Sequence, residues 1–509
     1  MTSEPAGPLL ARTVTEAAHR YGERAAFRIA DGTELSYREL DRASDEVAAG
    51  LAARGLGAGN VALLSLPSGP GYAVAYLAAA KLGVTTAGAN PRLRARERAL
   101  VVDAVDPDLV LATGPLSDGI PTDRRVEIID TDGSSAESVA HLLGDLRRHG
   151  DDIPPVPADP DRPTCICFTS GSTGDPRGAW FTDRQLAAIH QLDTGGAWGS
   201  GGHMVSGTAF AHVGVMTKLG WQLASGATIH VMDRWTAGGL LDLVERYRLP
   251  AVNGVAAQIA LLMQEPGFDE RDLSCVRSIV VGAGPSPPAL VAEARERFGA
   301  PYAIRYSSTE SGGIGLGTAL DADDDEALHT VGRARPGVAA EVRGADGGVL
   351  PDGEVGELWL RTPSAMSGYW NDPEGSAEAL VGGWLRTGDL ARVDGAGCFR
   401  LAGRISEMYI RGGYNVYPLE VEALLGTHPA VAQMAVVPRP DPIMGEVGVA
   451  VVVPLDPGWP PTLADLVAHG RNDLSGYKLP EAIRIVDRLP LNAGDKLDRR
   501  TLAAHEADS

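Results

Sequence analysis

A stretch rich in hydroxyl groups and glycine, residues 168–178, has the composition of an anion-binding loop. It reads Phe-Thr-Ser-Gly-Ser-Thr-Gly-Asp-Pro-Arg-Gly and carries one fixed cation, Arg177. The preceding residues 164–168 are short, apolar and rich in strand formers, which predicts a buried strand. Thr182, followed three residues later by Gln185, predicts the capping box of a helix. We therefore expect a strand-to-helix loop, where backbone N–H groups and hydroxyls can bind a phosphate.

Two common alternatives for such a loop do not fit its spacing. The sequence has no Walker A pattern, G-x-x-x-x-G-K-[ST], and the stretch lacks the G-x-S-x-G spacing of a hydrolase elbow. A flexible Ser/Gly surface loop is the remaining alternative, and the stretch alone does not decide between the two. Further motifs along the chain distinguish a phosphate-binding loop from a flexible surface loop.

The stretch resembles the phosphate-binding signature of the adenylate-forming superfamily, and the chain as a whole is most similar to its acyl-CoA synthetases, the AMP-dependent acid–CoA ligases. Further matches follow in the order expected for this superfamily and, with the first, span nearly the whole chain. They are Gly-Ala-Gly-Pro at 282–285, Tyr-Ser-Ser-Thr-Glu at 306–310, Thr-Gly-Asp at 387–389, the long segment 411–422 and Pro-Leu-Asn-Ala-Gly-Asp-Lys at 490–496. The shared order is much more specific than any one match.

The resemblance implies a set of nucleotide-binding residues. Tyr306 is expected to stack on adenine, Asp389 to accept both ribose hydroxyls, and Arg404 also to reach the nucleotide. The complete set comprises Thr169, Ser170, Gly171, Ser172, Thr173, Gly174, Arg177, Gly282, Ala283, Gly284, Tyr306, Ser307, Ser308, Asp389 and Arg404.

The resemblance also implies the residues that carry the reaction. Lys496 is expected to bridge the attacking carboxylate and the α-phosphate, because an ammonium there stabilises transition-state charge. Thr309 is the expected phosphate donor and Glu310 the expected ligand of Mg²⁺, a cation that often takes only one or two protein carboxylates. His212 matches the histidine that acyl-CoA ligases place at the acyl pocket; the alternative is a core histidine.

Two further groups of residues follow from the resemblance. Paired glycines are expected to leave room for the pantetheine arm of coenzyme A, whereas Glu420 and Glu422 are expected to be solvated helix residues. The predicted coenzyme A channel consists of Arg411, Gly412, Gly413 and Tyr414. The predicted acyl pocket consists of His212, Val213, Asn253, Gly282, Gly312 and Gly313.

The chain departs from the superfamily pattern at three positions. Arg177 replaces the usual lysine of the phosphate loop, which keeps the charge but exchanges a point charge for a planar fork. Ser406 stands at the hinge, where aspartate or lysine is usual, and Asp495 replaces the glycine before the catalytic lysine. We expect Arg177 and Asp495 to tune activity rather than abolish it, while Ser406 makes the hinge position approximate.

The implied reaction converts a carboxylic acid and Mg·ATP into an acyl adenylate and pyrophosphate, and then passes the acyl group to coenzyme A. Amino acids are disfavoured as substrates because Ala211 stands near where an aspartate would pair with their ammonium. Aliphatic and aromatic acids both remain open. So do an acyl carrier protein or an amine as acceptor, luciferase-like oxidation, and a non-enzymatic nucleotide-binding protein.

The predicted secondary structure around these residues differs between the first and the later parts of the chain. Strand and helix signals alternate to about residue 310, which predicts parallel α/β layers. Strand 278–281 is expected to lead into a helix with Ser286 as N-cap and Pro287 at its first position. After residue 330, short strands with Asp-Gly turns at 352–353 and 394–395 predict an antiparallel or barrel-like subdomain.

The predicted fold class is therefore α/β, with a large N-terminal domain and a small mobile α+β C-terminal domain. We place the N-terminal adenylation domain at 1–403, with α/β subdomains over about 1–330 and a barrel-like subdomain over about 331–403. The C-terminal domain is placed at 404–509. The superfamily resemblance implies that the latter rotates between the two half-reactions.

Composition limits the remaining choices. The chain has 509 residues, four cysteines without metal-type spacing, and a formal net charge of −21, which argues against non-specific nucleic-acid binding. We find neither a signal-peptide pattern nor an apolar run of spanning length, and so expect a soluble cytoplasmic protein. Its expected partners are a carboxylic acid, ATP, Mg²⁺ and coenzyme A.

Overall fold

The computed structural model describes residue 7 and residues 9–129, 142–169, 176–232, 234–284, 286–491 and 497–507. Its contacts divide the chain into two compact units. Unit 1 comprises Met1–Asp321, Ala334–Ala339 and Leu360–Leu385, and unit 2 comprises Ala322–Arg333, Ala340–Trp359 and Arg386–Ser509. The predicted domain boundary between residues 403 and 404 stays a prediction.

A seven-stranded sheet forms the first part of unit 1. Its order is β18 (Gly368–Tyr369), β8 (Arg177–Thr182), β7 (Pro163–Thr169), β4 (Thr85–Gly88), β3 (Val61–Ser65), β5 (Leu109–Thr113) and β6 (Val126–Ile129). The strands from β7 to β6 are parallel, whereas β8 and β18 are antiparallel additions. Such parallel strands need cover on both faces, which explains their nearly continuous apolar sequences.

Helices α1 (Leu9–Tyr21), α2 (Tyr37–Ala53), α3 (Pro70–Lys81), α4 (Ala95–Val105) and α5 (Asp183–Thr194) accompany this sheet. The N-cap of α2 is Ser36, whose side chain forms a capping box with Glu39. Helix α3 is buried on every side because it is built from small and apolar residues. Cys165 and Cys167 both enter the main core, while Ile166 between them packs in a second cluster on the other side of β7.

The predicted strand at 164–168 and the capping box at Thr182 are confirmed, but the expected strand-to-helix loop is wrong. The predicted phosphate-binding stretch connects β7 to β8, and α5 begins only after β8 ends. The reason is that Ala179 and Phe181 are buried and their strand pairs antiparallel with β7. The loop is therefore a connection between two antiparallel strands.

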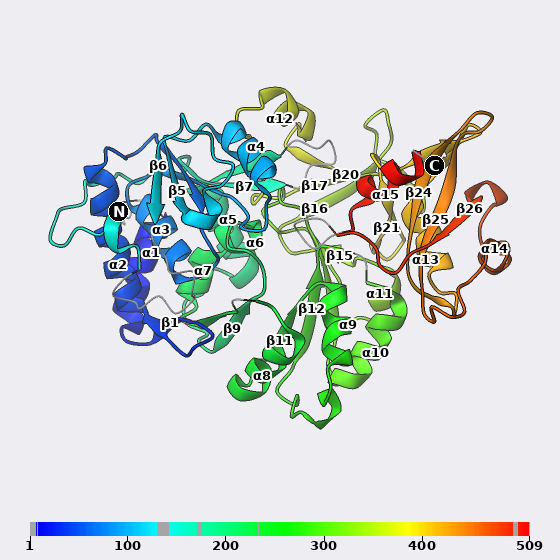
Figure 1. Ribbon diagram of the computed structural model, residues 1–509, viewed down its shortest axis with the longest axis horizontal. Helices are drawn as coiled ribbons and strands as arrows, with labels where there is room; N and C mark the ends of the chain where they lie inside the picture. The colour runs from blue at the N-terminus through cyan, green and yellow to red at the C-terminus, as the bar shows by residue number, and fades with distance from the viewer. Residues whose placement is uncertain are drawn as a thin grey trace. The chain divides into compact units, whose positions relative to one another are not determined.

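Two smaller sheets complete most of unit 1. The first has the order β2 (Glu34–Ser36), β1 (Ala25–Arg28), β10 (Thr228–Val231) and β9 (His203–Ser206). The second has the order β11 (Ala251–Gly254), β12 (Ser278–Gly282), β13 (Tyr302–Tyr306), β14 (Leu316–Gly317) and β15 (Arg333–Ala334). Helices α8 (Ala237–Tyr247), α9 (Ala256–Gln264) and α10 (Pro288–Phe298) lie beside β11 and β12 (Figure 1). Short helices α6 (Val213–Met216) and α7 (Leu219–Ala224) precede β10, and α12 (Pro373–Ala379) follows β18.

The start of α10 differs from its prediction by one residue. Pro287 is the N-cap and Pro288 opens the helix, whereas the hydroxyl of Ser286 lies 3.0 Å from the hydroxyl of Tyr302. Ser286 was predicted as the cap because the local pattern could not show that β13 offers its side chain another partner. The helix ends at Phe298, and Gly299 follows it in the left-handed conformation with a φ of 60°.

Between residues 339 and 404, all strands except β18 belong to a different kind of sheet, as predicted. Its order is β16 (Ala339–Arg343), β17 (Gly356–Arg361), β20 (Trp384–Val393) and β19 (Leu380–Val381), and β21 (Phe399–Arg404) pairs antiparallel with β20. In the turn between β20 and β21, the Asp394 carboxylate accepts hydrogen bonds from the amides of Ala396 and Cys398. Helix α11 (Asp324–His329) also lies in unit 2.

The last part of unit 2 is a mixed α+β layer, as predicted. Its sheet has the order β23 (Tyr414–Val416), β22 (Tyr409–Arg411), β25 (Gly445–Pro454) and β24 (Val431–Asp441), with β26 (Ala482–Ile485) paired to β25. Helices α13 (Pro418–Leu425), α14 (Leu463–Gly470) and α15 (Arg499–Ala507) gather around it (Figure 1). The predicted α/β fold class is confirmed. None of the helices in the described part of the chain has the length and apolar character needed to cross a lipid bilayer.

Candidate functional site

The two ends of the phosphate-binding stretch are held together by strand pairing. Thr169 ends β7 and Arg177 begins β8, and the two residues are partners in the antiparallel register. The Thr169 hydroxyl donates to the Arg177 carbonyl at 3.4 Å. The remaining predicted members of the loop, Ser170, Gly171, Ser172, Thr173 and Gly174, lie outside the described residues.

One tyrosine joins the cation of this loop to the predicted metal ligand. The Arg177 guanidinium lies over the Tyr369 ring at 5.3 Å, and its Nε lies 3.6 Å from the Asp372 carboxylate. The Tyr369 hydroxyl donates to the Glu310 carboxylate at 3.0 Å. Burial, and next the Glu310 charge, raise the pKa of Tyr369 well above its usual range, so it remains a neutral donor.

Tyr369 is a site residue that the sequence reasoning missed. Strand β18 brings it beside β8, where Tyr369 pairs with Ala179, two residues after Arg177. The dipeptide Tyr369-Trp370 was the available signal, because two adjacent aromatic residues are unusual in a chain with only 5% aromatic content. That composition alone, however, could not show which carboxylate the hydroxyl would meet.

The predicted segment 306–310 continues into a tightly bonded turn after β13. The Ser308 amide donates to the Ser311 hydroxyl at 3.0 Å, and the Ser311 amide donates to the Ser308 hydroxyl at 3.2 Å. The amide of Gly312 then donates to the Thr309 carbonyl at 2.9 Å, and the amide of Met366 donates to the Glu310 carbonyl at 2.8 Å. These bonds fix the backbone that carries Thr309 and Glu310.

Other predicted residues gather where parallel strands end. Asn253, Gly282 and Tyr306 lie near the carboxyl ends of β11, β12 and β13, the edge at which open α/β sheets bind ligands. A Cβ at Gly282 would lie 2.9 Å from the Arg305 carbonyl, so this position requires glycine. Ala283 has a φ of 65°, a left-handed conformation that is uncommon for alanine and often marks a functional turn. Ser307 and Gly284 follow on the adjoining loops.

His212 caps a short helix at the predicted acyl pocket. Its Nδ1 accepts a hydrogen bond from the Gly214 amide at 3.2 Å, and its side chain is exposed rather than in the core. Because Nδ1 is the acceptor, a neutral His212 carries its proton on Nε2. Val213, the next residue, is buried.

Glycines 312 and 313 lie in close contact with their surroundings. Both adopt positive φ values, 68° and 74°. A Cβ at Gly312 would collide with the Ser364 carbonyl, and one at Gly313 would lie 3.2 Å from Cε of Lys218. Glycine therefore permits the turn and leaves space beside the lysine, which places Lys218 next to the predicted acyl pocket.

In unit 2, the two predicted ribose-site residues contact each other. Asp389 on β20 and Arg404 on β21 are register partners, and Nε of Arg404 lies 2.8 Å from the Asp389 carboxylate. Gly388 has a φ of 70°. The Thr387 hydroxyl accepts a hydrogen bond from the Asp389 amide at 3.1 Å and donates to the Leu358 carbonyl at 2.7 Å. The carboxylate is thus largely buried and held by a cation.

The predicted coenzyme A segment forms the turn between β22 and β23. Gly412 and Gly413 adopt φ values of 55° and 88°, which suit glycine in a tight hairpin. Arg411 binds the Glu481 carboxylate at 2.6 Å, and the exposed Tyr414 ring stacks on Tyr477 at 4.7 Å.

The prediction that Glu420 and Glu422 are solvated is wrong for Glu422, whose side chain is 10% exposed, whereas that of Glu420 is 36% exposed. Glu422 accepts two hydrogen bonds from Arg499 at 2.6 Å and one from the Val436 amide at 2.6 Å. Glu420 accepts from Lys478 at 2.7 Å. Both partners are distant in sequence, so a local helix pattern could not reveal them.

The predicted catalytic Lys496 lies outside the described residues, and its role stays a prediction. The described residues contain no cluster of three or more His, Cys, Asp or Glu side chains that could hold a metal ion. Glu310 fits Mg²⁺ in another way, because it offers one hard oxygen ligand that a neutral hydroxyl orients. Mg²⁺ commonly takes its other oxygen ligands from water and substrate phosphates.

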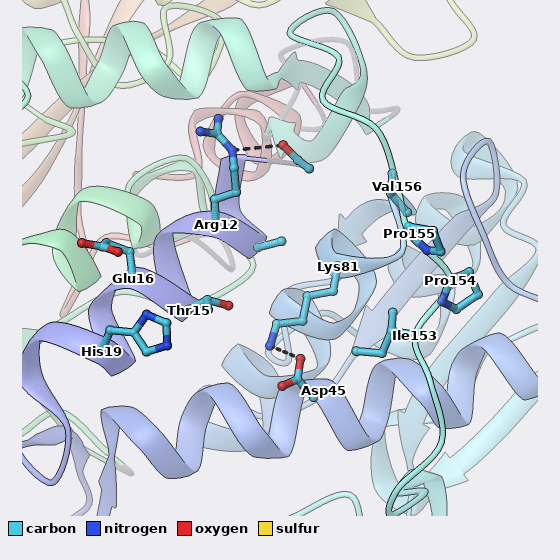
Figure 2. Close-up of a pocket in the computed structure, with 12 residues that line it drawn as sticks. Arg12, Thr15, Glu16, His19, Asp45, Lys81, Ile153, Pro154, Pro155 and Val156 are labelled. Atoms are coloured by element: carbon cyan, nitrogen blue, oxygen red, sulfur yellow. Dashed lines mark hydrogen bonds and ion pairs between the residues drawn. The ribbon is translucent and has the colours of Figure 1, made fainter. Parts of the chain in front are cut away.

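A separate surface pocket of about 450 Å³ contains none of the predicted site residues. It lies between α1, α2 and residues 153–156 (Figure 2). Its one lysine, Lys81, is nearly buried and binds two carboxylates, Asp41 at 2.7 Å and Asp45 at 2.5 Å. The positive charge is therefore already compensated, and the pocket offers no reactive group for the predicted chemistry.

Family profiles match most of the chain. The profile described as "AMP-binding enzyme" matches residues 14–370, and the profile described as "AMP-binding enzyme C-terminal domain" matches residues 420–496. Together they cover both the phosphate-binding stretch and the segment that ends at Lys496.

Several relatives of known activity align over nearly their whole length. An indoleacetate–CoA ligase of Aromatoleum aromaticum is 33% identical over 93% of this chain and 94% of its own. A feruloyl-CoA synthase of Amycolatopsis is 33% identical over 92% and 93%, respectively. A fatty acid–[acyl-carrier-protein] ligase, ScoC of Streptomyces coeruleorubidus, is 32% identical over 93% and 92%.

Solved structures share the fold over the complete chain. ATP-bound MatB from Rhodopseudomonas palustris is 25% identical and superposes with a TM-score of 0.87, covering 98% of this chain and 99% of its own. The Bacillus subtilis o-succinylbenzoate CoA synthetase in complex with its acyl-adenylate intermediate gives 0.84 at 25% identity, covering 98% of each chain. The amide bond synthetase McbA from Marinactinospora thermotolerans gives 0.83 at 28% identity, covering 98% and 100%.

Proposed function

The chain belongs to the family of AMP-binding enzymes, and from this premise we propose that it is an acyl- or aryl-CoA ligase. The chain activates a carboxylic acid by adenylation, with ATP as the second substrate. The proposal adds that the thiol of coenzyme A takes the acyl group from the adenylate.

In the first step, an oxygen of the substrate carboxylate attacks the α-phosphorus of ATP. A P–O bond forms, the bond to the bridging oxygen breaks, and pyrophosphate leaves. The carboxylate is already nucleophilic, so the protein must position the reactants and stabilise charge rather than remove a proton. Arg177 and the hydroxyl of Thr309 are the proposed phosphate-binding groups of unit 1.

Glu310 is the residue proposed to hold Mg²⁺, which supplies charge neutralisation on the phosphates when it is bound. The observation that carries the proposal is the bond from Tyr369 to Glu310 beneath the Arg177 guanidinium. It supports the proposal because Arg177, proposed to bind phosphate, and Glu310, proposed to hold the metal, both contact the same tyrosine.

In the second step, the coenzyme A thiol attacks the acyl carbon, a C–S bond forms, and AMP leaves with the electrons of the C–O bond. We propose that Asp389, with Arg404 beside it, accepts the ribose hydroxyls in both steps. The turn formed by Arg411, Gly412, Gly413 and Tyr414 is the proposed pantetheine channel. Lys496 is proposed to serve the first step.

A carrier protein is the second candidate acceptor. The specific observation in its favour is the carrier-protein ligase ScoC, which matches this chain at 32% identity. Both acceptors present the same pantetheine thiol, so the proposed channel does not distinguish them. Only the surface outside the channel would differ.

The test is pyrophosphate release with Mg·ATP over a panel of aliphatic, aromatic and amino acids, each with and without coenzyme A. We expect at least one aliphatic or aromatic acid to be activated, faster with coenzyme A, and its thioester to be visible by mass spectrometry. Turnover that ignores coenzyme A but responds to an acyl carrier protein would favour the second candidate. An amino acid as preferred substrate would contradict the proposal.

A further inference from the structure

A partly buried group of cations lies next to the predicted acyl pocket. Lys218 binds one oxygen of the Asp193 carboxylate at 2.8 Å, and Arg335 binds the other at 3.1 Å. The side chains are 18%, 11% and 24% exposed for Lys218, Asp193 and Arg335, respectively. Charges held this far from water need compensation by opposite charges.

A third cation adds to this imbalance. Arg305 on β13 donates to the carbonyls of Thr318 at 2.8 Å and Ile304 at 3.1 Å, which are neutral acceptors. Burial lowers its pKa, and the nearby positive charge of Arg335 lowers it further. Within the described part of the chain, Asp193 is the only carboxylate that pairs with any of the three cations.

The geometry connects these cations, which we call the cation cluster (Lys218, Arg305 and Arg335), to the substrate. A Cβ at Gly313 would lie 3.2 Å from Cε of Lys218 and 3.7 Å from its ammonium. Lys218 therefore adjoins Gly313, a residue that the proposed function assigns to the acyl pocket.

The other buried lysine of unit 1 shows the opposite arrangement. Lys81 is one cation with two carboxylate partners, Asp41 and Asp45. In the cation cluster, Lys218 and Arg335 share one carboxylate, and Arg305 is bonded only to neutral carbonyls. A purely structural ion pair would not need this excess of positive charge, whereas a site for an anion would use it.

We propose that the substrate acid carries a second anionic group at the end remote from the reacting carboxylate, and that the cation cluster binds it. This inference rests on the proposed function. The class of substrate is a dicarboxylic acid, in which one carboxylate is adenylated and the other meets Lys218 and Arg335. Two cationic donors of different shape suit a carboxylate, because it has two oxygens that can each accept.

The first experiment uses the wild-type enzyme and measures pyrophosphate release without coenzyme A. Its substrates are the straight diacids from succinic to sebacic acid, and terephthalic acid, each compared with its own monomethyl ester. The ester keeps the length and shape but removes the second charge. For the best diacid we expect kcat/KM to exceed that of its ester by about tenfold or more, mainly through KM.

The second experiment repeats the best pair with three variants. Lys218→Met should reduce the preference for the diacid by about tenfold, because one of its cations is lost. Asp193→Asn should preserve or increase the preference, because it removes only the competing carboxylate. Lys478→Met is the matched control, since Lys478 is also 18% exposed and also binds one carboxylate, that of Glu420, but belongs to unit 2. It should leave the preference unchanged.

Thermal unfolding of each variant checks that it is folded, and the wild-type comparison stands even if a variant is not. Equal kcat/KM for diacid and ester, or a preference for the ester, would overturn the inference while leaving acid activation established. Equal loss with both substrates in Lys218→Met and Asp193→Asn would also overturn it, because that is the signature of a structural role. No turnover of any acid in either panel would instead overturn the proposed function on which the inference rests.

Discussion

Two carboxylates proposed to serve the same nucleotide are held in opposite ways. Glu310, in unit 1, accepts a hydrogen bond from the neutral hydroxyl of Tyr369 and forms no ion pair within the described residues. Asp389, in unit 2, is paired with the Arg404 guanidinium at 2.8 Å. The first carboxylate is oriented but keeps its full charge for a cation. The charge of Asp389 is largely compensated by Arg404, which suits hydrogen bonding to a neutral ribose hydroxyl.

The side chain that binds a carboxylate indicates the role of that carboxylate more clearly than the carboxylate itself does. A neutral donor fixes geometry without competing for the charge, as a metal ligand requires. A cation lowers the cost of burying an acid whose work is hydrogen bonding. Substitutions at these carboxylates and at Tyr369 test this contrast.

Removing the charge of Glu310 should have the largest effect. Glu310→Gln keeps the shape and the bond to Tyr369 but loses the anion proposed to hold Mg²⁺. We expect the rate of acid-dependent pyrophosphate release to fall by about a thousandfold. Glu310→Asp, which keeps the charge, should retain more activity at high Mg²⁺. Near-normal turnover of Glu310→Gln would show that this carboxylate does not bind the metal.

The same change at Asp389 should act on nucleotide binding rather than on the chemical step. Asp389→Asn should raise KM for ATP by about thirtyfold, because it weakens hydrogen bonds to a charged acceptor. The wild-type enzyme should discriminate against 3′-deoxy-ATP, and the variant should lose much of this discrimination. Asp394→Asn, in the turn after the same strand, is the control. It should leave the KM for ATP and the discrimination against 3′-deoxy-ATP unchanged.

Tyr369 acts as a positioning residue, so its removal should have an intermediate effect. Tyr369→Phe should lower kcat/KM by about tenfold, the cost of one lost hydrogen bond to a charged group, and should raise the Mg²⁺ concentration needed for half-maximal rate. Tyr302→Phe also removes a buried hydroxyl with one side-chain partner, Ser286, and serves as the control. A loss of rate without a change in Mg²⁺ dependence would indicate a structural role only.

The pH dependence of stability should come partly from a histidine remote from both carboxylates in sequence. Burial, and next the charge of His203, lower the pKa of His230 to about 4. Its pKa in the unfolded chain is about 6.5, so the unfolded state binds more protons between these values. Stability should therefore fall as the pH drops from about 6.5 to 4, by at most about 3 kcal/mol from this group.

His230→Phe tests this by removing the titration while keeping an aromatic ring. Urea unfolding of both proteins at pH 7.5 and pH 5 should show a smaller loss in the variant. An equal loss would assign the acid sensitivity to other groups. The variant thereby separates acid inactivation caused by unfolding from inactivation caused by protonation of Glu310 or Asp389.

Much of the fold could be predicted because its signals are local. The buried strand 163–169 and the helix after Thr182 follow from apolar runs and a capping box that the sequence shows directly. The strand between them was missed because Arg177–Thr182 is short and needs β7 as a partner to form. The cap of α10 was misplaced because Ser286 has a tertiary partner.

The site could be predicted only as far as motifs extend. The sequence indicated Glu310, Asp389 and Arg404, but not that the last two bind each other. Tyr369 was missed because its partner Glu310 lies 59 residues away in sequence. Pairings of this kind depend on how distant strands align, which no local pattern contains. For the same reason, Glu422 was expected in solvent although Arg499 covers it.

The most direct test of acid activation is isotope exchange between labelled pyrophosphate and ATP, measured in the absence of any acceptor. Adenylation is reversible, so label should enter ATP only when a suitable acid is present. We predict exchange that depends on an aliphatic or aromatic acid, and its near-complete loss in Glu310→Gln. Exchange that proceeds equally without an acid, or no exchange with any acid in the panel, would contradict the account.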